Sequence, residues 1–307
     1  MKLSIITINR NNADGLRKTL ASVIEQTYRD IEYIVVDGAS TDGSVDVIRE
    51  MSASLNGGMS RNKSLNDGML FTWISEPDSG LYNAMNKGIE IASGFRVVDA
   101  LNRSKLIVDN VDKNKELPEY VLMLNSGDWL VDEHVIEKIM PELDGVDIIQ
   151  GNIIENHGDK ISRNRGYGKS EIDLFDILKG HFLHQASFCR RELFDKYGYF
   201  DESYRISADT KFFLYCLGRK DASFRYVDLD ISNYDMTGIS ADQSGKWAIY
   251  REEELCRLRE DLFSKRIFTF MLENDKKVRL YNDLRAHKWI WNLTMAVAHI
   301  NKWFYKK

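Results

Sequence analysis

The sequence has few cysteines, little excess charge and no long apolar run. Its cysteines, Cys189, Cys216 and Cys256, are three in number, lie far apart and form no CxxC pair, so the pattern indicates neither a zinc site nor a disulfide framework. A formal net charge of −5 gives no support for nucleic acid as a partner. No apolar run approaches the roughly 18 residues of a spanning helix, and MKLSIITINR lacks the apolar core of a signal peptide. We therefore expect a cytoplasmic protein, either soluble or bound peripherally at the inner face of the membrane.

What the sequence does contain, from its beginning, is a repeated order of strand, polar loop and helix. Apolar runs predict strands at residues 2–8, 31–36 and 70–75, the first two of them buried on both faces. Helices are predicted by apolar residues at helical spacing in residues 15–26, 44–51 and 81–92. This alternation predicts an α/β protein with a doubly wound, mostly parallel sheet. The loops after the strands meet at one edge of such a sheet, so we expect Asn9, Asp37 and Asp78 to lie near one another.

A fourth buried strand is predicted at residues 120–124, and it ends in Asn125-Ser126-Gly127-Asp128. Gly127 has no Cβ, so a bulky group can approach Asp128 closely. A carboxylate at this edge of the sheet suits a divalent metal held against a diphosphate. The alternative from these residues alone is an ordinary strand-to-helix turn in which Asp128 is a cap. Later elements are expected as a strand at 146–154 and as helices at 132–143, 170–179, 192–198, 208–217 and from 245 to about 285.

Five stretches together resemble family 2 glycosyltransferases with the GT-A fold. They are SIITINRNN, YIVVDGASTDGS, ISEPDSGLYNAMNKGIEIASG, VLMLNSGDWL and HQASFCRRELFDKYGYFDESYRISADTKFF. The third and the last are similar to bacterial members that decorate cell-surface polysaccharides. The resemblance implies a GT-A catalytic domain over residues 1–240, with a nucleotide-binding half at 1–130 and an acceptor half at 131–240. A helical extension would follow at 241–307.

The resemblance implies an inverting, metal-dependent transfer of a sugar from a nucleotide sugar, with UDP as the expected nucleotide, to a saccharide or lipid-linked acceptor. Base and ribose contacts would come from the ends of the first two strands, and donor contacts from the third loop and its helix. The residues so implied are Thr7, Asn9, Asp37, Asp78, Asn86 and Lys87. Without the resemblance, Thr7 and Asn9 are a capping loop, and Lys87 is a solvated helix residue.

The resemblance assigns Mn or Mg to the last carboxylate of a DXD motif, here Asp128. Hard oxygen ligands together with substrate phosphates are what Mg²⁺ prefers. Ser126 stands where the first carboxylate of this motif is frequent, so we expect a metal held weakly until the nucleotide arrives. His181 or His184 is a further candidate ligand, with a structural role as the alternative.

The resemblance implies that Asp209 is the catalytic base, which takes the proton of the acceptor hydroxyl. A carboxylate suits this task because it is ionised at neutral pH. Asp209 also lies where a helix is predicted to begin, so the alternative is an N-cap. In-line attack opposite the leaving group would invert the configuration at the anomeric carbon.

Three segments fall outside the family pattern. Residues 95–119 are an insertion without an assigned role. Residues 243–247, QSGKW, resemble the QxxRW signature of processive synthases, a match we interpret as chance. The tail from Trp289 is aromatic and basic, which suits a membrane surface and equally a helix docked on the catalytic domain or on a second subunit of a homo-oligomer.

Two other functions remain as alternatives. A nucleotidyltransferase that makes nucleotide sugars would need a glycine-rich phosphate loop after the first strand, and here no glycine occurs before Gly15. A non-catalytic nucleotide-sugar-binding domain would have no need of Asp37, Asp128 and Asp209 together.

Overall fold

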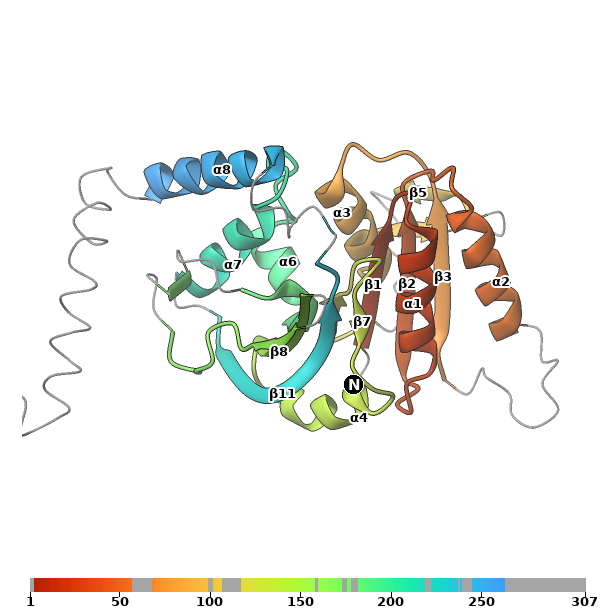
Figure 1. Cartoon of the computed structure of the whole chain (residues 1–307), viewed down its shortest axis with the longest axis horizontal. Coiled ribbons are helices and arrows are strands. Elements are labelled where there is room, and N and C mark those ends of the chain that lie inside the picture. The colour runs from red at the N-terminus through yellow and green to blue at the C-terminus, as the bar shows by residue number, and fades with distance from the viewer. Residues whose placement is uncertain are drawn as a thin grey trace, which may run out of the picture. The chain divides into compact units, whose positions relative to one another are not determined.

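The computed structural model describes most of the chain up to Leu262. The described residues are 3–56, 68–98, 102–106, 117–157, 160–172, 176–177, 182–218, 222–236, 238 and 245–262. The chain divides into two compact units, residues 1–254 and 255–307. The first unit carries the sheet and every described residue that the resemblance places in the site (Figure 1).

A nine-stranded sheet, counted over the described residues, runs through the first unit. Its order is β3 (Leu70–Ser75), β2 (Ile31–Asp37), β1 (Leu3–Asn9), β6 (Tyr120–Met123), β10 (Ser187–Arg190), β8 (Ile148–His157), β11 (Phe224–Tyr234) and β7 (Trp129–Leu130), with β9 (Lys160–Asn164) beside β8. The first four strands are parallel, as predicted. The other half is mixed, because β10 runs antiparallel to both of its neighbours and β11 is parallel to β8.

Helices cover both faces of the parallel half. They are α1 (Ala13–Ile24), α2 (Ser44–Asn56) and α3 (Leu81–Ala92). All seven residues of β1 are buried, and alternate side chains face opposite layers. Leu3 and Ile5 share a core with Leu16 of α1, whereas Ile6 meets α3 at Gly88, where a Cβ would lie 2.4 Å from the Ile6 side chain. This close contact sets α3 tightly against the strands whose ends form the ligand edge.

The described chain after β6 contains further helices and one long curved strand, β11 (Figure 1). The helices are α4 (Val135–Ile139), followed by a 3₁₀ turn at Met140–Leu143, then α6 (Glu192–Tyr197), α7 (Ala208–Gly218) and α8 (Lys246–Leu262). The helix predicted at 132–143 is therefore shorter, because Pro141 lies in the first turn of the 3₁₀ segment. Strand β11 was not predicted, although its segment VDLDIS alternates apolar and polar residues as a half-buried strand does.

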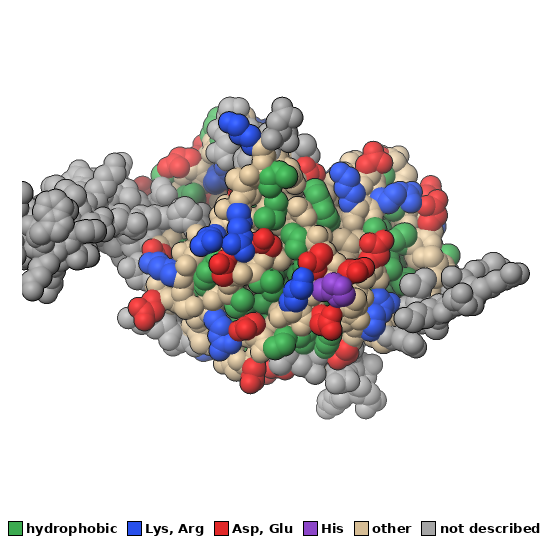
Figure 2. Space-filling model, turned by 60° about the horizontal axis from the view of Figure 1, so that its bottom comes forward, with side chains coloured by type: hydrophobic (Ala, Val, Ile, Leu, Met, Phe, Trp, Pro, Cys, Tyr) green, Lys and Arg blue, Asp and Glu red, His purple; other side chains and the backbone are tan. Residues whose placement is uncertain are grey.

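The insertion at 95–119 contains a small antiparallel hairpin, β4 (Arg96–Val98) and β5 (Ser104–Leu106). Arg96 anchors it through an ion pair with Glu90 of α3 at 2.7 Å and a hydrogen bond to Ser104. The aromatic-basic tail from Trp289 and His181 lie outside the described residues. Within the described part, no helix is long and apolar enough to cross a membrane. Basic and acidic side chains are interspersed on the face shown in Figure 2, in line with the small net charge.

Candidate active site

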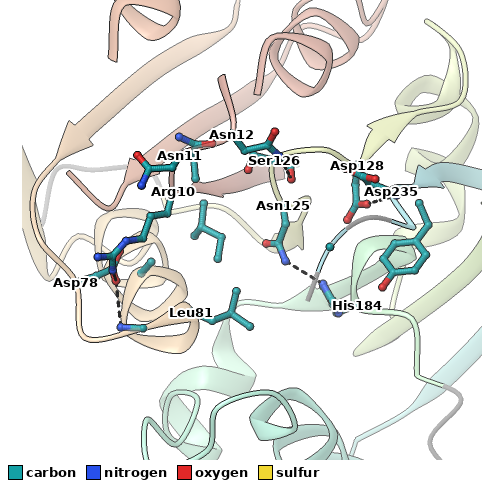
Figure 3. A pocket seen from close by; sticks show the side chains of 16 residues that line it. Arg10, Asn11, Asn12, Asp78, Leu81, Asn125, Ser126, Asp128, His184 and Asp235 are labelled. Carbon is teal, nitrogen blue, oxygen red and sulfur yellow. Dashed lines mark hydrogen bonds and ion pairs between the residues drawn. The ribbon is translucent and has the colours of Figure 1, made fainter. Parts of the chain in front are cut away.

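A cavity of about 590 Å³ lies at the carboxyl ends of β1 and β6 (Figure 3). Its size is that of an ordinary small-molecule site. Figure 3 shows Arg10 and Asp78 at one end, and Asp128, Asp235 and His184 at the other. The walls are formed by Ile8, Asn9, Arg10, Asn11, Asn12, Asp78, Gly80, Leu81, Ala84, Asn125, Ser126, Asp128, His184, Tyr234, Asp235 and Gly238.

At the first end of the cavity, the loops after β1 and β2 are joined through Asp37. Its carboxylate is fully buried and accepts hydrogen bonds from the Asn9 amide at 2.8 Å and the Ser75 hydroxyl at 2.7 Å. Ser40 donates two more, from its hydroxyl at 2.6 Å and its backbone N–H at 2.9 Å. Four donors satisfy this buried charge. The structure therefore shows Asp37 as the anchor of the loops and not as part of the cavity wall.

Asp78 comes from the loop after β3 and does line the cavity. It pairs with Arg10 at 3.3 Å and accepts the N–H of Gly80 at 3.1 Å. Gly38 is closely packed here, since a Cβ on it would lie 2.2 Å from the Asp78 carboxylate. Asn9, Asp37 and Asp78 thus lie together, as the parallel strands predicted.

Besides Asp37, three further residues that the resemblance implies for donor binding do not line the cavity. The Thr7 hydroxyl is fully buried and donates to the carbonyl of Leu124 at 2.7 Å. Asn86 binds both the N–H and the C=O of Phe200, at 3.0 and 2.9 Å, and so ties α3 to the loop before α7. Lys87 donates to the carbonyl of Pro77 at 2.8 Å and pairs with Glu76 at 2.9 Å. Each of them supports the site from behind.

Asp128 lies at the second end of the cavity, and only 5% of it is exposed. Its Oδ1 accepts the backbone N–H of Asp235 at 2.8 Å. Burial raises the pKa of the Asp128 carboxyl to about 7, and the nearby Asp235 carboxylate adds to this, against the opposing effects of the Asp235 N–H and of His184. The site therefore holds negative charge that the protein alone leaves poorly compensated.

Asp209 begins α7 and is held by two side chains from other elements. Tyr82 of α3 donates its hydroxyl to Oδ1 at 3.1 Å, and His184 Nδ1 lies 3.3 Å from Oδ2. Burial lowers the pKa of His184, but the hydrogen bond with Asp209 and the charges of Asp209 and Asp128 outweigh it, so the pKa is raised. The two carboxylates thus stabilise the protonated form of His184 by more than burial destabilises it. His184 lines the cavity, and Asp209 lies directly behind it with 16% of its side chain exposed.

Two important acidic residues were not singled out from the sequence. Asp235 follows β11, and it was missed because that strand was missed. Glu254 is a buried residue of α8 whose carboxylate accepts three backbone N–H groups ahead of α7, from Arg205 at 2.5 Å, Ile206 at 3.1 Å and Ser207 at 2.9 Å. The sequence shows Glu254 only within the charged helical run REEEL, with no signal that separates it from its neighbours Glu252 and Glu253.

The oxygen atoms around Asp128 suit a divalent cation that a bound ligand helps to hold. Asp235 Oδ2 would lie 2.6 Å from a Cβ on Gly127, so the glycine allows this second carboxylate to approach the turn. Among the described residues, the buried Oδ1 of Asn125 has no hydrogen-bond partner. No group of three or more His, Cys, Asp or Glu in the described part forms a complete metal site. Phosphate oxygens and water would have to complete the shell, as is usual for Mg²⁺.

Comparison with known proteins identifies the family. Residues 4–98 match the model of glycosyl transferase family 2. A Mycobacterium tuberculosis protein named as an uncharacterized glycosyltransferase is 31% identical over 247 residues, which cover 78% of this chain and 77% of that protein. A Mycobacterium bovis protein named PGL/p-HBAD biosynthesis glycosyltransferase is 26% identical, over 76% of this chain and 77% of that protein.

Two solved structures show the same fold at low identity. Staphylococcus aureus TarS 1–349 in complex with UDP-GlcNAc has a TM-score of 0.54 and 16% identity, over 76% of this chain and 58% of that one. The mannosyltransferase PcManGT of Pyrobaculum calidifontis in complex with GDP-Man and Mn²⁺ also has a TM-score of 0.54 and 16% identity, over 85% of this chain and 64% of that one. With 31% identity over most of both chains, this α/β protein with the GT-A fold belongs to glycosyl transferase family 2.

Proposed function

We propose that this glycosyltransferase is inverting and metal-dependent, and that it moves a sugar from a UDP-linked donor to a saccharide or lipid-linked acceptor in cell-surface polysaccharide synthesis. The observation that carries the proposal is a single cavity with carboxylates suited to a cation at one end and a held base, Asp209, directly behind its wall. TarS was solved with UDP-GlcNAc, which supports a UDP donor. The relative named for PGL/p-HBAD biosynthesis supports a role in a biosynthetic pathway.

In this proposal the nucleoside lies at the end of the cavity formed by Asn9, Arg10 and Asp78. The buried Oδ1 of Asn9 has no hydrogen-bond partner among the described residues, so it can accept an N–H of the base. The Asp78 carboxylate can accept a hydroxyl of the ribose. Asp37 orients the Asn9 amide through its 2.8 Å hydrogen bond. It therefore acts on the donor indirectly, by holding the loop.

The diphosphate lies toward Asp128, Asp235 and His184. A bound Mn²⁺ or Mg²⁺ held by the two carboxylates would supply charge neutralisation of the diphosphate. His184, whose pKa is raised, lines the same cavity. Its imidazole thus places a ring N–H that can donate a hydrogen bond beside the leaving group.

Asp209 performs the proton transfer. Its carboxylate accepts the proton of the acceptor hydroxyl while the hydroxyl oxygen forms a bond to the anomeric carbon. The bond from that carbon to the diphosphate oxygen breaks, and its electron pair leaves with the nucleoside diphosphate. Attack from the side opposite the leaving group inverts the anomeric configuration. Burial raises the pKa of the Tyr82 hydroxyl well above its usual value, so this hydroxyl stays protonated. Its hydrogen bond fixes the orientation of the Asp209 carboxylate.

The test is release of nucleoside diphosphate from a panel of UDP- and GDP-sugars with Mn²⁺, Mg²⁺ or EDTA. Asp209→Asn should lower the turnover by at least about 100-fold, the usual size of a general-base contribution, while calorimetry shows UDP binding unchanged. Glu192→Gln, an exposed carboxylate on α6, is the matched control. No release from any donor would favour the non-catalytic binding domain, and loss of UDP binding in Asp209→Asn would make Asp209 part of the donor site.

A further inference from the structure

A second cavity, of about 350 Å³, adjoins the first at the start of α3. Gly80 and Leu81 line both cavities, so only this turn separates them. The walls of the second cavity combine polar side chains with aromatic ones, chiefly Tyr82, Asn83, Glu202, Tyr204, Arg205 and Trp247. The donor assigned to the first cavity makes no use of these groups.

The second cavity is connected to the base by one side chain. Tyr82 lines it, and the hydroxyl of the same residue donates to Asp209 at 3.1 Å. Asp209 also contacts His184, which lines the donor cavity. The base therefore contacts one wall residue of each cavity. A molecule bound in the second cavity would lie against Tyr82, the side chain that holds the Asp209 carboxylate.

Glu202 is an exposed carboxylate that is nevertheless held in one position. Asn83 donates to its Oε2 at 3.0 Å and Asn86 donates to its Oε1 at 3.0 Å. An exposed carboxylate normally samples several rotamers. Because these hydrogen bonds already restrict Glu202 to one rotamer, its side chain loses little further entropy when a ligand binds. Each oxygen can accept more than one hydrogen bond. Glu202 is thus a preorganised acceptor for hydroxyl groups.

Trp247 adds a partly exposed aromatic surface to the same cavity. Tyr250, one turn along α8, packs edge-on against it at 5.8 Å between ring centroids, and the Arg205 guanidinium lies 4.2 Å above the Tyr250 ring. These contacts fix the indole at the start of α8. An aromatic ring presents an apolar face of the kind that packs on the C–H face of a pyranose.

We propose that this second cavity binds the acceptor as a neutral pyranose saccharide, with its C–H face on Trp247 and its hydroxyls on Glu202 and Asn83. The charges in this cavity favour a neutral sugar over a phosphate, because the Glu202 carboxylate repels an anion and compensates the positive charge of Arg205. The inference rests on the proposed function. It adds to that function the residues that recognise the acceptor.

The experiment uses the full chain and saturation-transfer NMR with p-nitrophenyl glycosides of glucose, galactose, mannose, rhamnose and N-acetylglucosamine at millimolar concentration. We expect at least one glycoside to bind the wild-type protein. Trp247→Ala should weaken that binding by about tenfold or more, equivalent to 1.4 kcal/mol, Trp247→Phe should restore part of it, and Glu202→Gln should weaken it less. Ile249→Ala, 59% exposed on the same helix and outside the cavity, should bind as wild type.

Two results would overturn the proposal. One is that no glycoside binds the wild-type protein, and the other is that the same glycoside binds Trp247→Ala as tightly as wild type. The unfolding midpoints of all variants, measured without ligand, show whether a loss of binding comes from a loss of fold. UDP binding, measured by calorimetry in parallel, separates the two hypotheses. A protein that binds the glycoside through Trp247 but binds no nucleotide would contradict the proposed function and leave a saccharide site.

Discussion

The two ends of the donor cavity use buried carboxylates in opposite ways. At the end formed by β1, β2 and β3, Asp37 is fully buried and accepts four hydrogen bonds from the loops around it. At the end formed by β6 and β11, Asp128 is almost as buried but accepts a backbone N–H from Asp235, whose own carboxylate is repulsive. The first carboxylate stabilises the fold, whereas the second costs stability that a cationic ligand would restore.

This difference separates scaffold from chemistry at one edge of the sheet. Natural proteins depart from locally favourable interactions chiefly at functional or strained sites and compensate for them elsewhere. A carboxylate with four donors is preorganised and inert. A carboxylate whose pKa is raised to about 7 is ready to exchange a proton for a metal cation. The same substitution at the two positions should therefore have opposite effects.

Asp128→Asn gives the largest expected effect, because it changes both activity and stability. Asn can still accept the Asp235 N–H, but it removes a carboxyl whose pKa rises from 3.8 to about 7 on folding. A raised carboxyl pKa means that the folded state binds the proton more tightly, so wild-type stability falls as pH increases from about 4 to about 7. Above that window the substitution should stabilise the protein by up to about 4 kcal/mol.

The measurement is urea unfolding of wild type and Asp128→Asn at about pH 4 and about pH 8. The gain should be present at the higher pH and nearly absent at the lower, while metal-stimulated nucleotide release falls by at least about 100-fold at both. Asp132→Asn, which changes an exposed carboxylate paired with Lys138 on the following turn, is the control. A variant that is less stable at the higher pH would show that Asp128 is structural, as the cap interpretation requires.

Asp37→Asn should have the opposite sign. The amide keeps one acceptor oxygen but turns an N–H₂ toward two donors, such as the Ser75 hydroxyl and the Ser40 N–H. Losing charge-assisted hydrogen bonds in a buried site should cost about 3 kcal/mol, measured by urea unfolding at neutral pH. Asp46→Asn on the exposed face of α2, where the side chain is 74% accessible, is the matched control. If Asp37→Asn keeps full stability but loses nucleotide binding, Asp37 contacts the donor directly, as the resemblance implied.

How far the sequence could predict this site depends on how local each signal is. Asp78 and Asp128 follow strands that are predicted from their apolar sequences, and the structure places both residues at the cavity. Asp235 follows β11, whose alternating apolar and acidic residues have the pattern of a half-buried strand and not that of the continuous apolar runs by which the other strands were predicted. Thr7 precedes the cavity residue Ile8, and Lys87 follows the cavity residue Ala84 by about one helical turn, but their side chains point into the fold. Sequence position gives the edge of the sheet, whereas packing decides which side chains face the ligand.

Glu254→Gln extends the comparison of buried carboxylates to one that lies outside the donor cavity and acts on Asp209 indirectly. Its three N–H donors lie on residues 205–207, immediately before the helix that begins with Ala208 and Asp209. Gln offers one acceptor oxygen and adds two donors, so we expect a loss of stability of about 2 kcal/mol. Turnover should fall by about tenfold through displacement of Asp209, with the donor KM unchanged.

The readouts for Glu254→Gln are urea unfolding and the initial rate of nucleotide release, and the neighbouring exposed Glu253→Gln is its matched control. A protein ending at residue 240, the boundary implied by the resemblance, should show a larger loss, because without α8 it lacks both Glu254 and Trp247. Equal activity of Glu254→Gln and Glu253→Gln would mean that the loop before α7 keeps its conformation without the cap.

Lys87→Met gives the smallest expected effect and tests whether the first end of the cavity is purely scaffold. Lys87 pairs with Glu76 and donates to the carbonyl of Pro77, next to Asp78. Met preserves the length of the side chain, and Glu76 retains its hydrogen bond from Ser104 at 2.7 Å. The donor KM should therefore rise only about threefold, about 0.6 kcal/mol, with turnover unchanged and exposed Lys105→Met as control. A rise of 100-fold or more would instead show that Lys87 binds the diphosphate directly, and the contrast between the two ends of the cavity would then be wrong.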